Sequence, residues 1–271
     1  MKILLLANKD IASNIALNNL FQTMTMQHEF KVLLSATVGN NTQSKPQCLL
    51  DLAFFEQGLF NQILFPALQN NPPPITRKRL SFNGFKTLGI EVSDIYSINC
   101  PAGLKIVNEF APDLIVSIRF GLILQSAIIK IPKFGVINLH SGELPTYRGV
   151  MATFRAMQQN ATEFGTTLHY INDIGIDSGE IVSISKQTLN YQRSYLYNTL
   201  SLYETGINDV VNAISMIEKS GKCESYSADT QGNYFSFPCE QELIDFQQRG
   251  HKLYEYQDVI DIAQNYYRDN L

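Results

Sequence analysis

The stretch that decides the fold covers residues 134–149 and reads FGVINLHSGELPTYRG. Apart from Asn138, its residues 136–139 are apolar, which is typical of a strand buried in a parallel sheet. Asn138 and His140 stand two residues apart at the end of this run, so they face the same side of the strand. Ligands of open parallel sheets bind beyond the carboxyl ends of the strands. The stretch therefore predicts a site where an amide holds a carbonyl oxygen and an imidazole accepts a proton.

The start of the chain predicts the sheet to which this strand belongs. Residues 2–7 read as a buried strand, residues 10–21 as a helix, and residues 30–38, FKVLLSATV, as a second strand. A strand–helix–strand opening is typical of an α/β fold, here a doubly wound, mostly parallel sheet. The first turn, ANKDIASN, lacks the glycines of a dinucleotide-binding fingerprint, which argues against NAD.

Changes in the hydrophobic pattern predict how the chain is divided. The pattern of buried strands is interrupted at about residues 40–88, which we expect to form a helical insertion. A long helical pattern ends at Gly221, a residue type that commonly ends helices. We therefore expect a catalytic domain over residues 1–221, followed by a small C-terminal α+β extension over residues 222–271.

A second polar stretch, residues 165–182 (GTTLHYINDIGIDSGEIV), carries Asp177 in a glycine-punctuated loop between two strand-like runs. Together the two stretches resemble the formyltransferases that use 10-formyltetrahydrofolate, a family that includes methionyl-tRNA, glycinamide ribonucleotide and nucleotide-sugar N-formyltransferases. Its pattern is Asn-x-His, a Leu-Pro-x-x-Arg-Gly-like turn, Gly-x-Thr-x-His, and an Asp in a Gly-x-Asp-x-Gly loop. The matching residues are Asn138, His140, Leu144, Pro145, Arg148, Gly149, Gly165, Thr167, His169, Gly175, Asp177 and Gly179.

The resemblance implies a Rossmann-like catalytic domain and a transfer of a one-carbon group. In such a reaction Asn138 would donate to the oxyanion, His140 would move protons, and Asp177 would orient the imidazole, directly or through a water. Thr167 and His169 would support the site from the neighbouring strand. This chemistry needs no metal and no covalent intermediate.

The resemblance also implies a site for 10-formyltetrahydrofolate as the cosubstrate. The segment after the predicted strand at residues 114–118 resembles the part of the family that holds the pterin ring. Position 120 is Phe where relatives commonly carry Tyr. The residues predicted to bind the folate are Phe120, Gly121, Leu122, Ile123, Leu124, Ile174 and Gly175.

Four charged residues are predicted to contact the amine substrate. Arg77 and Lys78 belong to a basic cluster that could pair with phosphates, although such a cluster is most often a solvated loop. Arg148 of the family turn is a third cation. Glu143 replaces an apolar residue of the family. It is either an exposed charge in a loop or a group that attracts the ammonium form of the substrate. Ser141 and Gly142 are exchanged relative to the family, which puts any serine-specific contact in doubt.

Composition predicts the compartment. The chain has 271 residues and a net charge of −4, with four widely spaced cysteines, so we expect neither a disulfide nor a zinc site. The apolar run at the N-terminus is too short for a signal peptide or a membrane span. We therefore expect a cytoplasmic protein without a membrane partner.

Charge distribution favours a small substrate over a nucleic acid. Residues 221–271 hold four basic and nine acidic residues, a formal charge of −5, which would repel a nucleic-acid backbone. The preferred acceptor is the amino group of a nucleotide-linked sugar. Other amines (methionyl-tRNA, a glycinamide-like metabolite, a siderophore precursor), hydrolysis of formyltetrahydrofolate and a non-catalytic folate-binding role stay open. The oligomeric state is also open, with a homodimer as one option.

Overall fold

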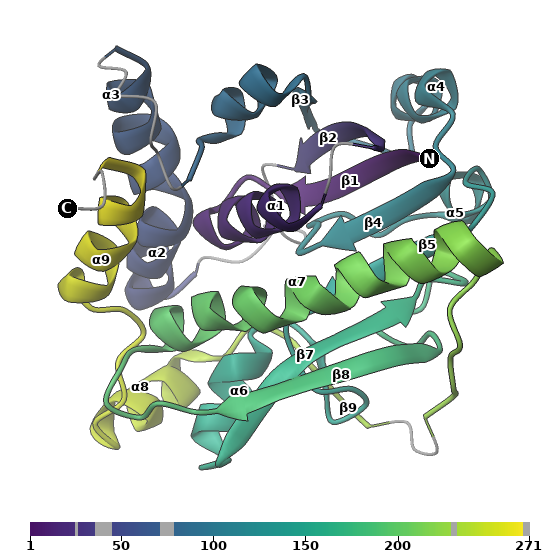
Figure 1. Cartoon of the computed structure of the whole chain (residues 1–271). Coiled ribbons are helices and arrows are strands. Elements are labelled where there is room, and N and C mark those ends of the chain that lie inside the picture. Colours follow the sequence, from purple (N-terminus) through teal and green to yellow (C-terminus); the bar gives the residue numbers. More distant parts are fainter. Residues whose placement is uncertain (25–26, 36–44, 71–78, 229–231, 268–271) are drawn as a thin grey trace.

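The computed structural model describes residues 1–24, 27–35, 45–70, 79–228 and 232–267. Its centre is a seven-stranded sheet in the order β3-β2-β1-β4-β5-β7-β8 (Figure 1). The strands are β1 (Lys2–Asn8), β2 (Glu29–Ser35), β3 (Glu91–Ile95), β4 (Leu114–Ile118), β5 (Val136–His140), β7 (Glu163–Tyr170) and β8 (Ile181–Thr188). The strands from β3 to β5 are parallel, while β7 runs antiparallel to both β5 and β8. The predicted α/β fold with a mostly parallel sheet is confirmed.

Helices cover both faces of the sheet because its central strands are apolar on both sides. On β1, Ile3 and Leu5 belong to one buried cluster, while Leu4 and Leu6 belong to another. The first cluster lies under α1 (Ile11–Thr23) and α7 (Tyr195–Ser220), which cross one face in Figure 1. The second cluster lies under α4 (Pro101–Phe110) and α5 (Ser126–Ile129). Gly221 caps α7 with φ of 81°, as the sequence predicts.

The described part of the predicted insertion is helical. A continuous helical run comprises α2 (Gln47–Ala53), η1 (Phe54–Leu64) and α3 (Phe65–Asn70), and η2 (Phe82–Leu88) precedes β3. Arg77 and Lys78 lie outside the described residues.

The C-terminal segment consists of β9 (Asn233–Phe235), α8 (Glu240–Gln248) and α9 (Tyr256–Tyr267). Phe246 and Tyr266 belong to the same buried cluster as α1 and α7. The Tyr266 hydroxyl donates to Oδ1 of Asn14 on α1 at 2.5 Å. The segment is thus packed into the core of the sheet domain, and the domain boundary at residue 221 stays a prediction. The remaining elements are β6 (Tyr147–Gly149), which pairs with β9, and α6 (Ala152–Gln158).

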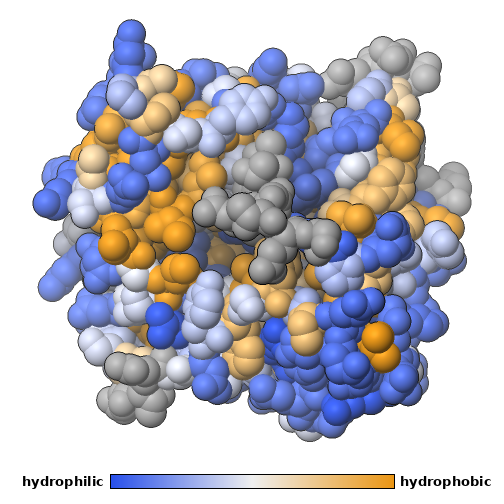
Figure 2. Space-filling model, turned by 180° about the vertical axis from the view of Figure 1, so that it is seen from behind, coloured by the Kyte–Doolittle hydropathy of each residue, from blue (hydrophilic) through white to orange (hydrophobic). Residues whose placement is uncertain are grey.

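The surface seen from behind is mixed in character. Figure 2 shows apolar and polar residues interspersed on this face, with apolar residues gathered on one side of it. Among the described residues, Leu50, Phe54 and Ile63 of the helical run are large apolar side chains that stay exposed. The insertion therefore contributes apolar side chains both to the core and to the exposed surface.

Candidate active site

Strand pairing brings the two sequence motifs together at the carboxyl end of β5. Antiparallel pairing of β5 with β7 sets Asn138 opposite His169 and His140 opposite Thr167. Opposed residues on adjacent strands have Cβ atoms about 4.5–5.5 Å apart. The Asn-x-His motif and the Gly-x-Thr-x-His motif therefore share one space.

His169 fixes the orientation of Asn138. The Nδ1 atom of His169 lies 2.9 Å from the Tyr170 carbonyl oxygen, which can only accept, so Nδ1 carries the proton. In the neutral ring, Nε2 is then an acceptor, and it lies 3.0 Å from Nδ2 of Asn138. The amide thus donates one N–H to the ring, and its second N–H remains for a ligand. Asn138 itself is half-buried.

His140 is held by a main-chain carbonyl on one side and by a carboxylate on the other. Its Nε2 atom donates to the Tyr147 carbonyl oxygen at 2.7 Å, and its Nδ1 atom lies 3.5 Å from Oδ2 of Asp177. A Cβ at Gly142 would stand 2.7 Å from this Nε2 atom, so any side chain there would displace the ring. The imidazole can therefore exchange a proton at Nδ1, next to an anion that stabilises the imidazolium.

Asp177 is the negative charge of the site. Its Oδ2 atom accepts from the Gly149 N–H at 2.8 Å, and its Oδ1 atom lies 3.6 Å from Nε2 of His169. Burial works against ionisation of this carboxyl, but His140 and the Gly149 N–H outweigh burial and hold its pKa well below the usual range. Asp177 therefore stays a carboxylate throughout the neutral pH range.

Main-chain anchors hold the loops that carry these residues. Arg148 donates from Nε and Nη2 to the Ile176 carbonyl oxygen, at 3.1 and 2.8 Å, and so ties the Asp177 loop to the 147–149 turn. The Thr167 hydroxyl donates to the Gly142 carbonyl oxygen at 2.8 Å and accepts from the Leu144 N–H at 3.0 Å. Thr167 thereby fixes the loop after His140.

The C-terminal strand β9 supports the catalytic turn from outside. In the β6–β9 pairing, Gly149 lies opposite Phe235, and the Val150 N–H donates to the Phe235 carbonyl oxygen at 3.0 Å. Gly149 has φ of 94°, and a Cβ there would stand 2.2 Å from that carbonyl oxygen. Sequence reasoning missed this contact, and the one signal for it was the glycine of the Arg-Gly turn.

The residues predicted to bind folate lie at the end of β4 and in the Asp177 loop. The Gly121 N–H donates to the Ser35 hydroxyl at 3.0 Å, and Leu124 is buried. In contrast, the apolar side chains of Ile123 and Ile174 are 58% and 63% exposed. These two residues leave uncovered apolar surface on both segments, which suits a flat, partly apolar ligand.

The predicted substrate residues have different surroundings. Arg148 binds the Ile176 carbonyl as described above, and Oε1 of Glu143 lies 2.8 Å from Nζ of Lys186. Arg79, which belongs to the same basic cluster as Arg77 and Lys78, is buried.

A second charged group, missed by sequence reasoning, lies at the carboxyl ends of β1 and β4. Arg119, with a left-handed φ of 57°, donates from Nε to Oδ2 of Asp10 at 3.0 Å and from Nη1 to the Tyr203 hydroxyl at 3.4 Å. Its Nη2 atom lies 3.7 Å from Oε1 of Glu56. Burial raises the pKa of Glu56 to about 7, although Arg119 opposes this shift.

Within the described ranges, no group of three or more His, Cys, Asp or Glu side chains is placed to hold a metal ion. No helix among those residues combines the length and apolar character needed to cross a membrane.

Comparison with known proteins agrees with this geometry. A family model described as formyl transferase matches residues 99–254, more than half of the chain and all of the site around Asn138. The methionyl-tRNA formyltransferase of Chlamydia pneumoniae is 29% identical over 129 residues, which are 48% of this chain and 40% of the relative. The chain thus matches less than half of that relative's length.

Solved structures resemble the whole chain at lower identity. A sugar N-formyltransferase from Shewanella sp FDAARGOS_354 superposes with a TM-score of 0.56 at 15% identity, covering 98% of this chain and 87% of the other. The N-formyltransferase from Helicobacter canadensis, in complex with folinic acid and dTDP-3-aminofucose, has a TM-score of 0.52 at 20% identity, covering 89% and 72%. These likenesses show the fold, and the family match shows more: the chain belongs to the formyl transferase family.

Proposed function

We propose that this protein is an N-formyltransferase that moves the formyl group of 10-formyltetrahydrofolate to a primary amine. The observation that carries the proposal is the single cluster that Asn138, His140, His169 and Asp177 form at the carboxyl end of β5. In it Asn138 is hydrogen-bonded to His169, and the Asp177 carboxylate lies 3.5 and 3.6 Å from the two imidazoles. The folate, when bound, supplies the activated formyl group. The protein has to stabilise the formyl oxygen and to move protons between two nitrogens.

Each residue of the group has a role in that transfer. As the amine nitrogen forms its bond to the formyl carbon, the formyl oxygen gains negative charge, and the free N–H of Asn138 can donate to it. His140 takes the proton that the amine loses and holds it as an imidazolium beside Asp177. When the bond between the formyl carbon and the folate nitrogen breaks, that nitrogen receives a proton. The products are a formamide and tetrahydrofolate.

We infer that the folate lies against residues 120–124 and the Asp177 loop. The supporting observation is the exposed apolar surface of Ile123 and Ile174 on either segment, beside the Asn138 strand. Phe120, Gly121, Leu122, Leu124 and Gly175 would complete this surface. Titration calorimetry with tetrahydrofolate should give measurable heat. No binding by protein that is folded by circular dichroism would contradict the assignment.

For the acceptor we propose the amino group of a nucleotide-linked sugar. The acidic C-terminal segment favours a small substrate over tRNA, and Arg77, Lys78 and Arg148 are the candidate partners for its phosphates, with Glu143 a candidate for its ammonium form. The second candidate is methionyl-tRNA, because the relatives similar in sequence carry that name.

The test is to incubate the protein with 10-formyltetrahydrofolate and nucleotide-linked amino sugars, methionyl-tRNA or glycinamide ribonucleotide, and to weigh the products. An incubation without an amine measures hydrolysis of the folate, and the Asn138→Ala protein is the control. We expect a mass gain of one formyl group on an amino sugar, with little change between low and high salt. Efficient formylation of methionyl-tRNA, falling steeply with added salt, would overturn the sugar proposal, since phosphate contacts of tRNA release counterions.

A further inference from the structure

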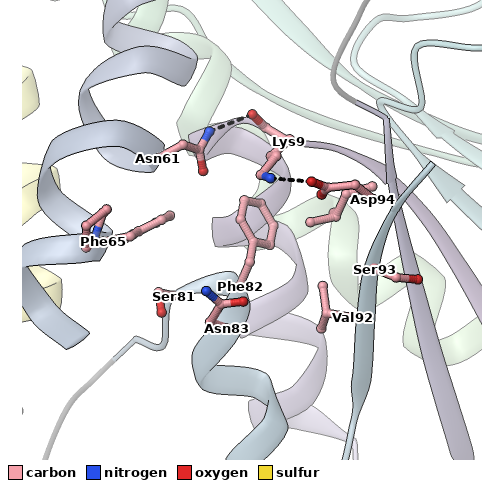
Figure 3. Close-up of a pocket in the computed structure, with 11 residues that line it drawn as sticks. Lys9, Asn61, Phe65, Ser81, Phe82, Asn83, Val92, Ser93 and Asp94 are labelled. Carbon is pink, nitrogen blue, oxygen red and sulfur yellow. Dashed lines mark hydrogen bonds and ion pairs between the residues drawn. The ribbon is translucent and has the colours of Figure 1, made fainter. Parts of the chain in front are cut away.

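A cavity of about 240 Å³ lies at the carboxyl ends of β1, β2 and β3 (Figure 3). Its walls come from five separate parts of the chain: the end of β1, β2, the helical run η1–α3, the start of η2, and β3. Because β2 and β1 separate β3 from β4, this cavity is on the opposite half of the sheet from Asn138 and His140. Its volume is smaller than the roughly 300–1,000 Å³ of pockets for whole drug-sized ligands. It suits one ring of a larger molecule.

The lining combines aromatic walls with a polar edge. Phe65 and Phe82 stand edge to face, with ring centroids 6.0 Å apart and an angle of 89°. Figure 3 shows the Phe82 ring below the ion pair between Lys9 and Asp94, whose Nζ and Oδ2 atoms are 2.6 Å apart. Such a mixture of apolar faces and a few fixed polar groups is what binds flat heterocycles in proteins.

The polar groups that line the cavity include both donors and acceptors. Asn61 donates one N–H to the Lys9 carbonyl oxygen at 2.8 Å. The side-chain amide of Asn61 also has a second N–H and an oxygen. Asn83 contributes a second, exposed amide. Asp94 uses Oδ2 on Lys9, and a carboxylate has a second oxygen that only accepts. A ring that carries an N–H next to carbonyl groups can donate to the carboxylate and accept from an amide.

The cavity is within reach of the catalytic group. Neighbouring strands are about 4.8 Å apart, so β1, which carries Lys9 at its end, is roughly 10 Å from β5, and β3, which carries Asp94, is roughly 19 Å from β5. A pentose, a diphosphate and the sugar itself have to span the distance from Asp94 to the catalytic group. Lys9, which is paired with Asp94, and Arg119 at the end of β4, which is paired with Asp10 and Glu56, are the cations between the two places.

We propose that this cavity holds the nucleobase of the nucleotide-linked substrate while its amino sugar lies at Asn138 and His140. The inference rests on the proposed function, and it adds that the protein selects which nucleobase the substrate carries. Uracil, thymine and guanine carry a ring N–H that Asp94 can accept, whereas adenine carries none. A site built around such a hydrogen bond rejects a ligand that lacks it. The adenosine that ends every tRNA is therefore a poor occupant.

The test is calorimetric binding of UDP, dTDP, GDP and ADP to the full chain, without folate and without sugar. We expect at least one of the first three to bind, and ADP to bind at least tenfold more weakly. Asp94→Asn and Asn83→Ala should each weaken the preferred nucleotide about tenfold. Asn108→Ala, which alters an exposed residue of α4, is the matched control. Tetrahydrofolate binding should be equal in all four proteins.

The outcomes separate this inference from the proposed function. If nucleotide sugars are formylated but Asp94→Asn and Asn83→Ala bind nucleotide as the wild type does, the cavity is not the base site. ADP binding as tight as that of the other nucleotides would overturn the inference in the same way. If the variants lose nucleotide binding as expected and yet no amine is formylated, the cavity stands and the proposed function fails.

Discussion

The main-chain N–H of Gly149 donates a hydrogen bond of 2.8 Å to Oδ2 of Asp177, and the same residue pairs with Phe235 in the small β6–β9 sheet. One backbone position therefore links the anion of the catalytic group to the C-terminal segment of the chain. Its neighbours have similar double roles, because Tyr147 accepts from His140 and Arg148 holds the Ile176 carbonyl. Each residue of this turn fixes a different part of the site.

Replacing Asn138, His140 or Asp177 by Ala should abolish most turnover and leave the fold intact. Loss of one donor to a developing oxyanion costs about 2.7–4 kcal/mol, or 10²–10³ in kcat, so we expect a loss of this size for Asn138→Ala. The double and triple variants should be little worse than the worst single one, because the residues act in one step. Steady-state kinetics measure this, with Asn208→Ala, at an exposed position of α7, as the control. Nearly full activity of His140→Ala would assign the proton transfer to another residue.

His169 should act through Asn138 and Asp177 rather than on the substrate. His169→Leu removes the acceptor 3.0 Å from the Asn138 amide and a partner of the carboxylate, so we expect kcat to fall at least tenfold with KM little changed. His169→Gln offers an amide oxygen as acceptor and should recover part of kcat. Equal activities of the Leu and Gln variants, with equal melting temperatures, would show that the hydrogen bond to Asn138 is unimportant.

Gly149→Ala should damage both stability and catalysis. The left-handed backbone alone costs an L residue about 1–2 kcal/mol, and the added Cβ would also stand 2.2 Å from the Phe235 carbonyl oxygen. Gly89→Ala is the matched control, since Gly89 has φ of 76° and a Cβ added there would meet nothing within 4 Å. We expect similar backbone strain in both, measured by urea unfolding, and at least tenfold lower kcat only in Gly149→Ala. A normal kcat in that variant would mean that the turn adapts without moving Asp177.

Glu56 should make the protein less stable as the pH rises. Burial raises its folded pKa to about 7 from an ordinary value of 4.5, so the folded state prefers the protonated form. The raised pKa contributes to the free energy of unfolding. This contribution is at its full size below the pKa of the unfolded state and is lost as the pH rises through 7. With 17% of the side chain exposed, the loss is at most about 3 kcal/mol.

Glu56→Gln removes this titration. The difference in the free energy of unfolding, variant minus wild type, should therefore increase from pH 5 to pH 8. Urea unfolding at pH 5, 6, 7 and 8 measures the difference. Glu109→Gln, at an exposed position of α4, controls for the loss of one negative charge. Parallel pH curves for wild type and Glu56→Gln would contradict the raised pKa.

Much of the fold and the central site could be predicted because the signals are local. The apolar run of β5, the spacing of Asn138 and His140, and the glycine loop around Asp177 lie within short stretches. Pairing of β5 with β7 then brings in His169. The contacts that escaped prediction join distant segments, as Arg119 does with Asp10 across 109 positions and Lys186 with Glu143 across 43. No pattern in a single sequence marks such pairs, and the left-handed backbone of Arg119 has no glycine to indicate it.

The pairing of β6 with β9 has a consequence for the order in which the site is assembled. Domains generally begin to fold from the N-terminus while the chain is being synthesised. All of the proposed catalytic side chains precede residue 178, but the strand that covers the 147–149 turn is made only with residues 233–235. A nascent chain at that stage has the chemistry of the site on an open strand edge, which is prone to pairing with other chains. Closure of the turn therefore waits until residues 233–235 have been synthesised, so the growing chain contains the proposed catalytic side chains before the turn that positions them is closed.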